Sequence, residues 1–313
     1  MSTSTWFDDL PVVGALPPEK AAATLRETGE DEVAEALEHL YEGTSPGVSL
    51  EGQKHWLSFL DKPWLYANHV FGYLAPTAPG DASNDPLPIS PLNAIHTDPL
   101  LKHTRVKITL DRFRVANYPG RGSHHILVHF FAQNQVASTK EDLHFSATYR
   151  VSQGDQVAIR GYPIFVGLSV SNEGIRLRCR TINVKNDQDE ALLNVLESKV
   201  FTSGLHLVST LQPAIAPLSE LAYGLTEMVA KRHRNISVQD FDLGLDFSNI
   251  PTGARLAEGA YLAVQVPESE EPVWDWEDWI YHPSSGQVVK QSNYQEAIPY
   301  NYLVFSIRRY EGT

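Results

Sequence analysis

The stretch IRLRCRTINV, residues 175–184, decides the fold class that we expect for this chain. Successive side chains of a β-strand point to opposite faces of its sheet. Apolar side chains share one face of the stretch and cationic side chains share the other: Ile175, Leu177 and Cys179 against Arg176, Arg178 and Arg180. This alternation predicts a strand with one face in a core. Cys179, the single cysteine, is then expected to be buried and unreactive.

A second stretch, QDFDLGLDF at residues 239–247, has the same period with the opposite charge. Asp240, Asp242 and Asp246 share one face, and the apolar positions share the other. The three aspartates resemble calcium-binding loops such as the paired aspartates of C2 domains, at a tighter spacing. That resemblance would imply a bound calcium ion. A half-buried strand with an acidic face accounts for every residue, and we favour this interpretation.

Three roles are open for the row formed by Arg176, Arg178 and Arg180. The guanidiniums can be solvated, or they can pair with the aspartate row on a neighbouring strand, where opposite charges attract by roughly 0.2–1 kcal/mol per pair. They can also bind a phosphate, a lipid headgroup or an acidic partner, because guanidinium groups suit oxyanions. We keep these three arginines as candidate binding residues.

The same period of two recurs through the second part of the chain. It predicts strands at KITL, HHILVHFF, LHFSATYRV, PIFVGLSV, SVQDFDLGLDF, YLAVQV, VWDWEDWIY and YLVFSIRRY. Turn residues separate several of them, including Asn134-Gln135 and Asn172-Glu173-Gly174. Helical spacing interrupts the strands at about 187–234. Because strands and helices do not alternate regularly, we expect an α+β fold: a helical N-terminal region followed by an antiparallel β-sandwich with a helical insertion.

The N-terminal part has a different pattern. Residues 18–42 predict two short helices, broken at Thr28-Gly29, and the aromatic stretch 54–73 predicts a third helical element. Residues 75–91 are rich in proline, serine, aspartate and glycine, which is typical of a linker. We therefore predict an acidic helical region at 1–74, a proline-rich linker at 75–103 and the β-sandwich domain at 104–313.

Charge and composition exclude some function classes. The chain has 313 residues and a net charge of −13, and residues 1–103 hold 15 acidic but only 5 basic side chains. Such a chain repels nucleic acid at long range, so we expect no nucleic-acid partner. We find no apolar run of the ~20 residues that a membrane-spanning helix needs, and no signal-peptide pattern. Together with the single cysteine, this composition favours a cytoplasmic protein.

The histidines suggest at most a weak metal site. His129 and His144 are expected on the outward, solvent-facing sides of their strands, opposite the apolar residues, so they approach one another if the strands pair. Imidazole nitrogens bind zinc and copper, but no carboxylate is evident beside them. His125 is four residues from His129, about 13 Å along a strand, and cannot share an ion with it. We predict no metal and no cofactor.

The stretch VWDWEDW, residues 273–279, holds half of the six tryptophans. Six acidic residues lie between Glu268 and Asp278. We expect an amphipathic hairpin at the edge of the sandwich, whose carboxylates prevent pairing with other chains. Trp274, Trp276 and Trp279 are candidate binding residues, because aromatic anchors inside an acidic rim suit a basic partner.

No nucleophile elbow, P-loop or dinucleotide fingerprint is present, so an enzyme is not the favoured interpretation. We expect a non-catalytic protein-interaction or scaffold module that acts through the acidic helical region and the tryptophan hairpin. One alternative is a domain that senses a phosphorylated ligand or hydrolyses a substrate with a metal. Another is a regulated protease substrate that is cut within residues 75–91, because exposed linkers are natural cleavage sites.

Overall fold

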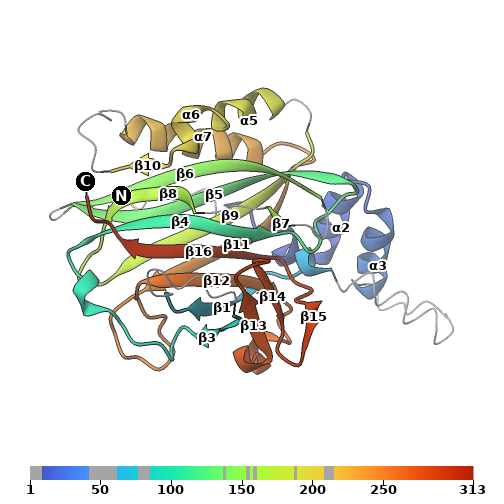
Figure 1. Ribbon diagram of the computed structural model, residues 1–313. Helices are drawn as coiled ribbons and strands as arrows, with labels where there is room; N and C mark the ends of the chain where they lie inside the picture. Colours follow the sequence, from blue (N-terminus) through green and yellow to red (C-terminus); the bar gives the residue numbers. More distant parts are fainter. Residues whose placement is uncertain are drawn as a thin grey trace.

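The computed structural model describes residues 9–41, 62–76, 85–136, 139–152, 156–157, 161–186, 189–207 and 215–312. These residues form an α+β fold in layers (Figure 1). A helical N-terminal region and a helical insertion accompany an antiparallel sandwich, so the predicted fold class is confirmed. No helix among these residues is long and apolar enough to cross a membrane.

The largest layer is a sheet that we call the large sheet, with the order β10-β8-β4-β16-β12-β1-β3 and with β7 beside β4. Among the described strands of this sheet, β10 and β8 pair in parallel and the other pairs are antiparallel. Its strands are β10 (Leu205–His206), β8 (Tyr162–Ser169), β4 (Arg105–Arg114), β16 (Tyr302–Arg309), β12 (Gly259–Val266), β1 (Asn68–Leu74), β3 (Ser90–Pro91) and β7 (Gln156–Val157).

A second sheet, which we call the facing sheet, has the order β11-β9-β5-β6 and is antiparallel throughout. Its strands are β11 (Ile236–Leu245), β9 (Ile175–Val184), β5 (Ser123–Val136) and β6 (Thr139–Ser152). The main core lies between the two sheets, where Leu177, Phe241 and Leu243 are buried against large-sheet residues such as Phe305. Period-two alternation therefore placed the interior correctly.

Helices of the insertion cover the other face of the facing sheet (Figure 1). They are α5 (Glu190–Leu196), α6 (Lys199–Thr202) and α7 (Ile215–Ala230). A second apolar cluster fills the space beneath them, and it joins Leu127 and Ile182 of the sheet to Leu225 and Val229 of α7. This sheet face was expected to meet water, and in the structure it is largely buried, because a later segment folds back over it.

The N-terminal helices are α2 (Pro18–Arg26) and α3 (Asp31–Tyr41), as predicted for residues 18–42. Gly29 adopts a φ of 81° between them, a conformation that other residues rarely take. Leu25 and Val33 are buried in the same cluster as the sandwich core. The short 3₁₀ turns Val13–Ala15, Pro63–Leu65 and Pro99–Leu101 lie in the same part of the chain.

A third sheet, which we call the outer sheet, packs on the far face of the large sheet. It consists of β2 (Leu87–Pro88), β13 (Trp279–His282), β14 (Gln287–Lys290) and β15 (Asn293–Ala297) in the order β15-β14-β13-β2. Two 3₁₀ turns precede β13, at Glu271–Val273 and Trp276–Asp278. Buried residues such as Val264, Val304 and Val288 fill the space between the two sheets.

Three local predictions are wrong. Within the stretch 54–73, residues 68–73 belong to strand β1 rather than to a helix, and 54–61 lie outside the described residues. Asn134 and Gln135 lie inside β5 rather than in a turn. Residues 273–278 form turns rather than a strand, although the hairpin itself exists between β13 and β14.

The division into 1–74, 75–103 and 104–313 stays a prediction, but β1 already pairs with β12, and residues 87–91 of the predicted linker supply β2 and β3. Residues 77–84 of the same linker are not described, so cleavage there is also a prediction.

Candidate functional site

The arginine and aspartate rows face one another on β9 and β11. The register places Asp240 opposite Arg180 and Asp242 opposite Arg178. Arg180 donates to Asp240 directly opposite it, while Arg178 donates to Asp240 and Arg176 to Asp242 along the diagonal. We call these five residues the charge ladder. Of the three roles that were open for the arginines, pairing across strands is the one that the structure contains.

Burial differs along the charge ladder. The Arg180 side chain is 1% exposed, and its second donor reaches the backbone carbonyl of Leu10 at 2.5 Å. The Arg178–Asp240 pair is bidentate, at 2.9 and 2.7 Å. Arg176 is 54% exposed, and the hydrogen bond that it donates to Asp242 raises the pKa of its guanidinium. An oxyanion ligand would have to displace a carboxylate at each of these arginines, which disfavours the ladder as an anion site.

The calcium interpretation of the aspartates does not fit this geometry. Asp240 and Asp242 accept hydrogen bonds from guanidiniums, and Asp246 accepts from the backbone and hydroxyl of Ser248, both at 2.7 Å. Among the described residues, no group of three or more His, Cys, Asp or Glu side chains could hold a metal ion. The strand interpretation of QDFDLGLDF is therefore confirmed.

His129 and His144 do approach one another, as the pairing of β5 with β6 predicted. The Nε2 atom of His129 lies 3.2 Å from Nδ1 of His144. Nδ1 of His129 contacts Ser146 Oγ at 2.7 Å and Thr226 Oγ1 at 3.2 Å. Burial lowers the pKa of His144 to about 4 and that of His129 well below its ordinary value, so both rings are neutral near pH 7.

The chain Ser146–His129–His144 has the composition of a nucleophile, a base and an orienting group. Ser146 and His129 are fully buried, and α7 seals them with Thr226. Neither residue lines any of the clefts described below. A nucleophile must reach its substrate, so this network stabilises the contact between sheet and helix rather than serving catalysis. Cys179 is likewise buried, and burial raises the pKa of its thiol.

The three candidate tryptophans occupy different environments. Trp276 is 4% exposed, and its indole N–H donates to the carbonyl of Phe71 at 3.0 Å. The ring lies over Gly72, where a β-carbon would be 2.9 Å from it. Trp274 and Trp279 are half-buried and stack with ring centroids 5.8 Å apart. Trp276 is therefore a core residue, and Trp274 and Trp279 retain exposed surface.

A groove of about 370 Å³ opens beside Trp274, and we call it the tryptophan groove. Segments far apart in sequence line it: His69, Val70 and Phe71 of β1; Pro91, Leu92 and Asn93; Thr252, Gly253 and Ala254; and Glu271, Trp274 and Trp276. Its walls combine aromatic and apolar side chains with polar groups such as those of Asn93, Thr252 and Glu271. The sequence singled out only the tryptophans, because the other walls lie more than 170 residues away or in an undistinguished loop.

The segment 268–279, which we call the tryptophan segment, contributes Glu271, Trp274 and Trp276 to this groove and carries five further acidic residues. Its six carboxylates are all exposed: Glu268, Glu270, Glu271, Asp275, Glu277 and Asp278. Glu271 accepts a hydrogen bond from Asn68, and Asp275 caps the turn at Glu277. No ion pair joins any of the six to a cation within the described part of the chain. Val273, in the middle of the segment, is 73% exposed.

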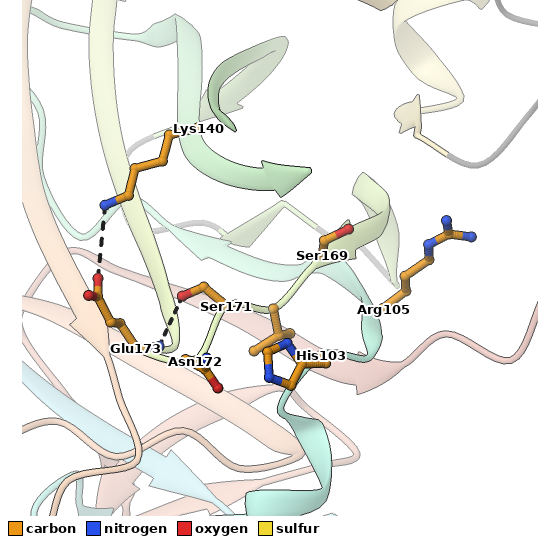
Figure 2. Close-up of a pocket in the computed structure, with 8 residues that line it drawn as sticks. His103, Arg105, Lys140, Ser169, Ser171, Asn172 and Glu173 are labelled. Carbon is orange, nitrogen blue, oxygen red and sulfur yellow. Dashed lines mark hydrogen bonds and ion pairs between the residues drawn. The ribbon is translucent and has the colours of Figure 1, made fainter. Parts of the chain in front are cut away.

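A separate cleft of about 510 Å³ lies at the β8–β9 turn (Figure 2). Its cations are Arg105, Lys140 and, when protonated, His103. Figure 2 shows Lys140 extended towards Glu173, with the two charged groups 3.9 Å apart, and Arg105 pointing away from them. An adjoining cleft of about 400 Å³ also contains Lys140 and extends to Arg176 and Asp242. Recognition of an oxyanion requires cations that converge on one point, and the cations of these two clefts do not.

Comparison with known proteins found no match to this chain: no family model, no curated protein and no solved structure.

Proposed function

We propose that this chain is a non-catalytic interaction module that docks a basic segment of a protein partner in the tryptophan groove. The observation that carries the proposal is the coincidence of an aromatic groove with six exposed carboxylates that lack an ion-pairing cation among the described residues. Interfaces are enriched in aromatic anchors, and matched charges around them guide association. On this proposal the protein acts in the cytoplasm as a scaffold or regulator.

The groove assigns separate tasks to its residues. Trp274 supplies the exposed aromatic surface, which suits the aliphatic stem of a lysine or the plane of an arginine guanidinium. Glu271 lines the groove and lies within reach of the charged end of such a side chain. Trp276 is a structural residue, because it is buried and its indole N–H is bonded within the chain.

The acidic helical region supplies a second contact in this proposal. Asp31 and Glu32 at the start of α3 are exposed, whereas Glu38 is bonded to Arg26. A basic partner long enough to reach both surfaces would gain affinity from two linked contacts.

The test uses the full chain and synthetic peptides that carry lysine or arginine around one apolar residue. Trp274→Ala is expected to weaken binding of the best peptide at least about tenfold, as loss of an interface anchor does. Tyr294→Ala is the matched control, because Tyr294 is an aromatic residue of the outer sheet that is 57% exposed and does not line the groove. Equal loss in both variants, or no binding by any basic peptide, would remove the basis of the proposal.

A further inference from the structure

Helix α7 carries apolar residues on two adjacent stripes. The inner stripe packs onto the facing sheet through residues such as Ala222, Leu225 and Val229. The outer stripe consists of residues spaced by four, three and four positions: Pro217, Leu221, Gly224 and Met228. Leu221 and Met228 are 44% and 46% exposed, although both are large apolar side chains.

The composition of α7 indicates a helix that is buried on more than one side. Residues 215–230 contain two acidic side chains, Glu220 and Glu227, and no basic ones. A helix that packs on one face usually has a polar outer face, and a helix that is apolar around most of its circumference is usually buried. The outer stripe also has the seven-residue repeat with which helices pack along one another.

We propose that the outer stripe is the contact of a two-fold dimer, in which α7 packs antiparallel against α7 of a second copy of this chain. The stripe is nearly symmetric about Gly224, since Leu221 and Met228 lie three residues before and four residues after it. An antiparallel pair centred there brings Leu221 of each copy against Met228 of the other. A two-fold contact needs such a self-complementary surface.

Charges at the two ends of the stripe favour this arrangement. Glu220 flanks the stripe near its start, is exposed, and has no ion-pairing partner in the described chain. Lys231 directly follows α7, continues the spacing of the stripe beyond Met228, is 51% exposed, and pairs with Glu227 at 2.6 Å. Antiparallel packing places Glu220 of one copy near Lys231 of the other, whereas parallel packing places like charges together.

Gly224 fits the centre of such a contact. Apart from its chain neighbours and the backbone of α7 itself, no described atom lies within 4 Å of the position that its β-carbon would occupy, so packing within the described residues does not require a glycine there. Glycine inside a helix is destabilising relative to alanine. A glycine at a helix crossing lets two backbones approach closely. A dimer contact centred on Gly224 therefore accounts for a glycine at this position.

Sedimentation of the full chain tests the proposal. The wild type is expected to be dimeric at high concentration and to dissociate on dilution. Gly224→Arg is expected to be monomeric with an unchanged circular dichroism spectrum, because its β-carbon would point into open space within the described chain. Tyr294→Arg, on the exposed outer sheet, is the control and remains dimeric. A wild type that is monomeric throughout, or a Gly224→Arg variant that dimerises like it, would overturn the proposal.

A cysteine test locates the axis. The only natural cysteine, Cys179, is buried, so Gly224→Cys introduces a single accessible thiol. Mild oxidation is expected to join two copies rapidly through this position, because a disulfide requires the two α-carbons within about 7 Å. Tyr294→Cys should cross-link only at the slow rate of random collision. Equal rates for the two variants would show that α7 does not lie on the axis.

Discussion

The charge ladder and the tryptophan segment are the two most strongly charged features of the sandwich, and they differ in how their charges are matched. Every arginine of the ladder is bonded to an aspartate on the adjacent strand. None of the six carboxylates of the tryptophan segment has a cationic partner among the described residues. From the sequence alone, residues of both features were candidate binding residues. The difference teaches that charge which the fold neutralises itself serves stability, and charge that it leaves unmatched is available to a partner.

The largest expected effect comes from breaking the buried end of the ladder. Asp240→Ala leaves Arg180 with a charged side chain that is 1% exposed and has lost its carboxylate. Removing one partner of a buried ion pair typically costs about 3–5 kcal/mol of unfolding free energy. Chemical denaturation should therefore show a loss of that size. A loss below about 1 kcal/mol would mean that water or another group replaces Asp240, and that the ladder is not a structural device.

Acid should destabilise the protein through its buried histidines. The pKa values of His124 and His144 are lowered to about 4 by burial, and that of His129 lies well below 6.5. As the pH falls below about 6.5 the unfolded chain takes up protons that the folded chain does not, so stability falls until the folded pKa is reached. Each such histidine contributes about 1.4 kcal/mol per pH unit in this window. His144→Gln should lower the slope by about one proton; an unchanged slope would contradict the assignment.

The exposed end of the ladder should matter much less than the buried end. Asp242→Ala removes the partner of Arg176, a pair whose side chains are 36% and 54% exposed. Exposed ion pairs contribute about 0–1 kcal/mol. Comparing the losses of unfolding free energy in Asp242→Ala and Asp240→Ala therefore measures how much burial strengthens an arginine–aspartate pair. Similar losses for both variants would show that exposure does not distinguish the two ends.

The smallest effects on stability are expected at the tryptophan segment and at Arg176, the exposed arginine of the charge ladder. Glu270→Gln with Glu277→Gln should change unfolding free energy by less than about 0.5 kcal/mol, because surface substitutions without partners rarely do more. The same pair of changes should weaken the binding of a basic peptide, most clearly at low salt. A variant that is destabilised instead would show that these carboxylates support the fold.

Phosphate tests whether the ladder could still bind anions. Sulfate and phosphate stabilise most proteins by exclusion from their surfaces, so the informative quantity is the difference between variants. The rise in Tm with phosphate should be equal for the wild type and Arg176→Gln. If Arg176→Gln abolishes the rise in Tm, the cleft that contains Lys140 and Arg176 would again be a candidate ligand site.

Local periodicity predicted most of the sandwich but not its coverings. Strand β9 begins and ends at the predicted residues, since alternation is a property of neighbouring side chains. Strand β1 was missed because both of its faces pack against apolar clusters, Val70 and Leu74 towards the outer sheet and Phe71 and Tyr73 towards the main core, and strands covered on both faces do not alternate. The exposed position expected for His129 was wrong because α7, about 90 residues later, covers that face.

The site was predictable only in part for the same reason. The acids and tryptophans are adjacent in sequence, so they could be singled out together. That Trp276 is buried depends on Gly72, some 200 residues away, and the groove depends on β1 and on the loop around Gly253. Likewise, pairing of the arginine row with the aspartate row was one of three options, and it depends on β9 and β11 being neighbours in the sheet.

The most direct test of the central claim is a titration of the ¹⁵N-labelled full chain with a short lysine-rich peptide, followed through the six tryptophan indole N–H resonances. We expect the Trp274 indole signal and the backbone amides of residues 268–279 to shift with the peptide. The Trp276 indole, which is bonded to Phe71, and the amides of the charge ladder should stay in place. Shifts centred on Arg176 to Arg180, or none at all, would contradict the account.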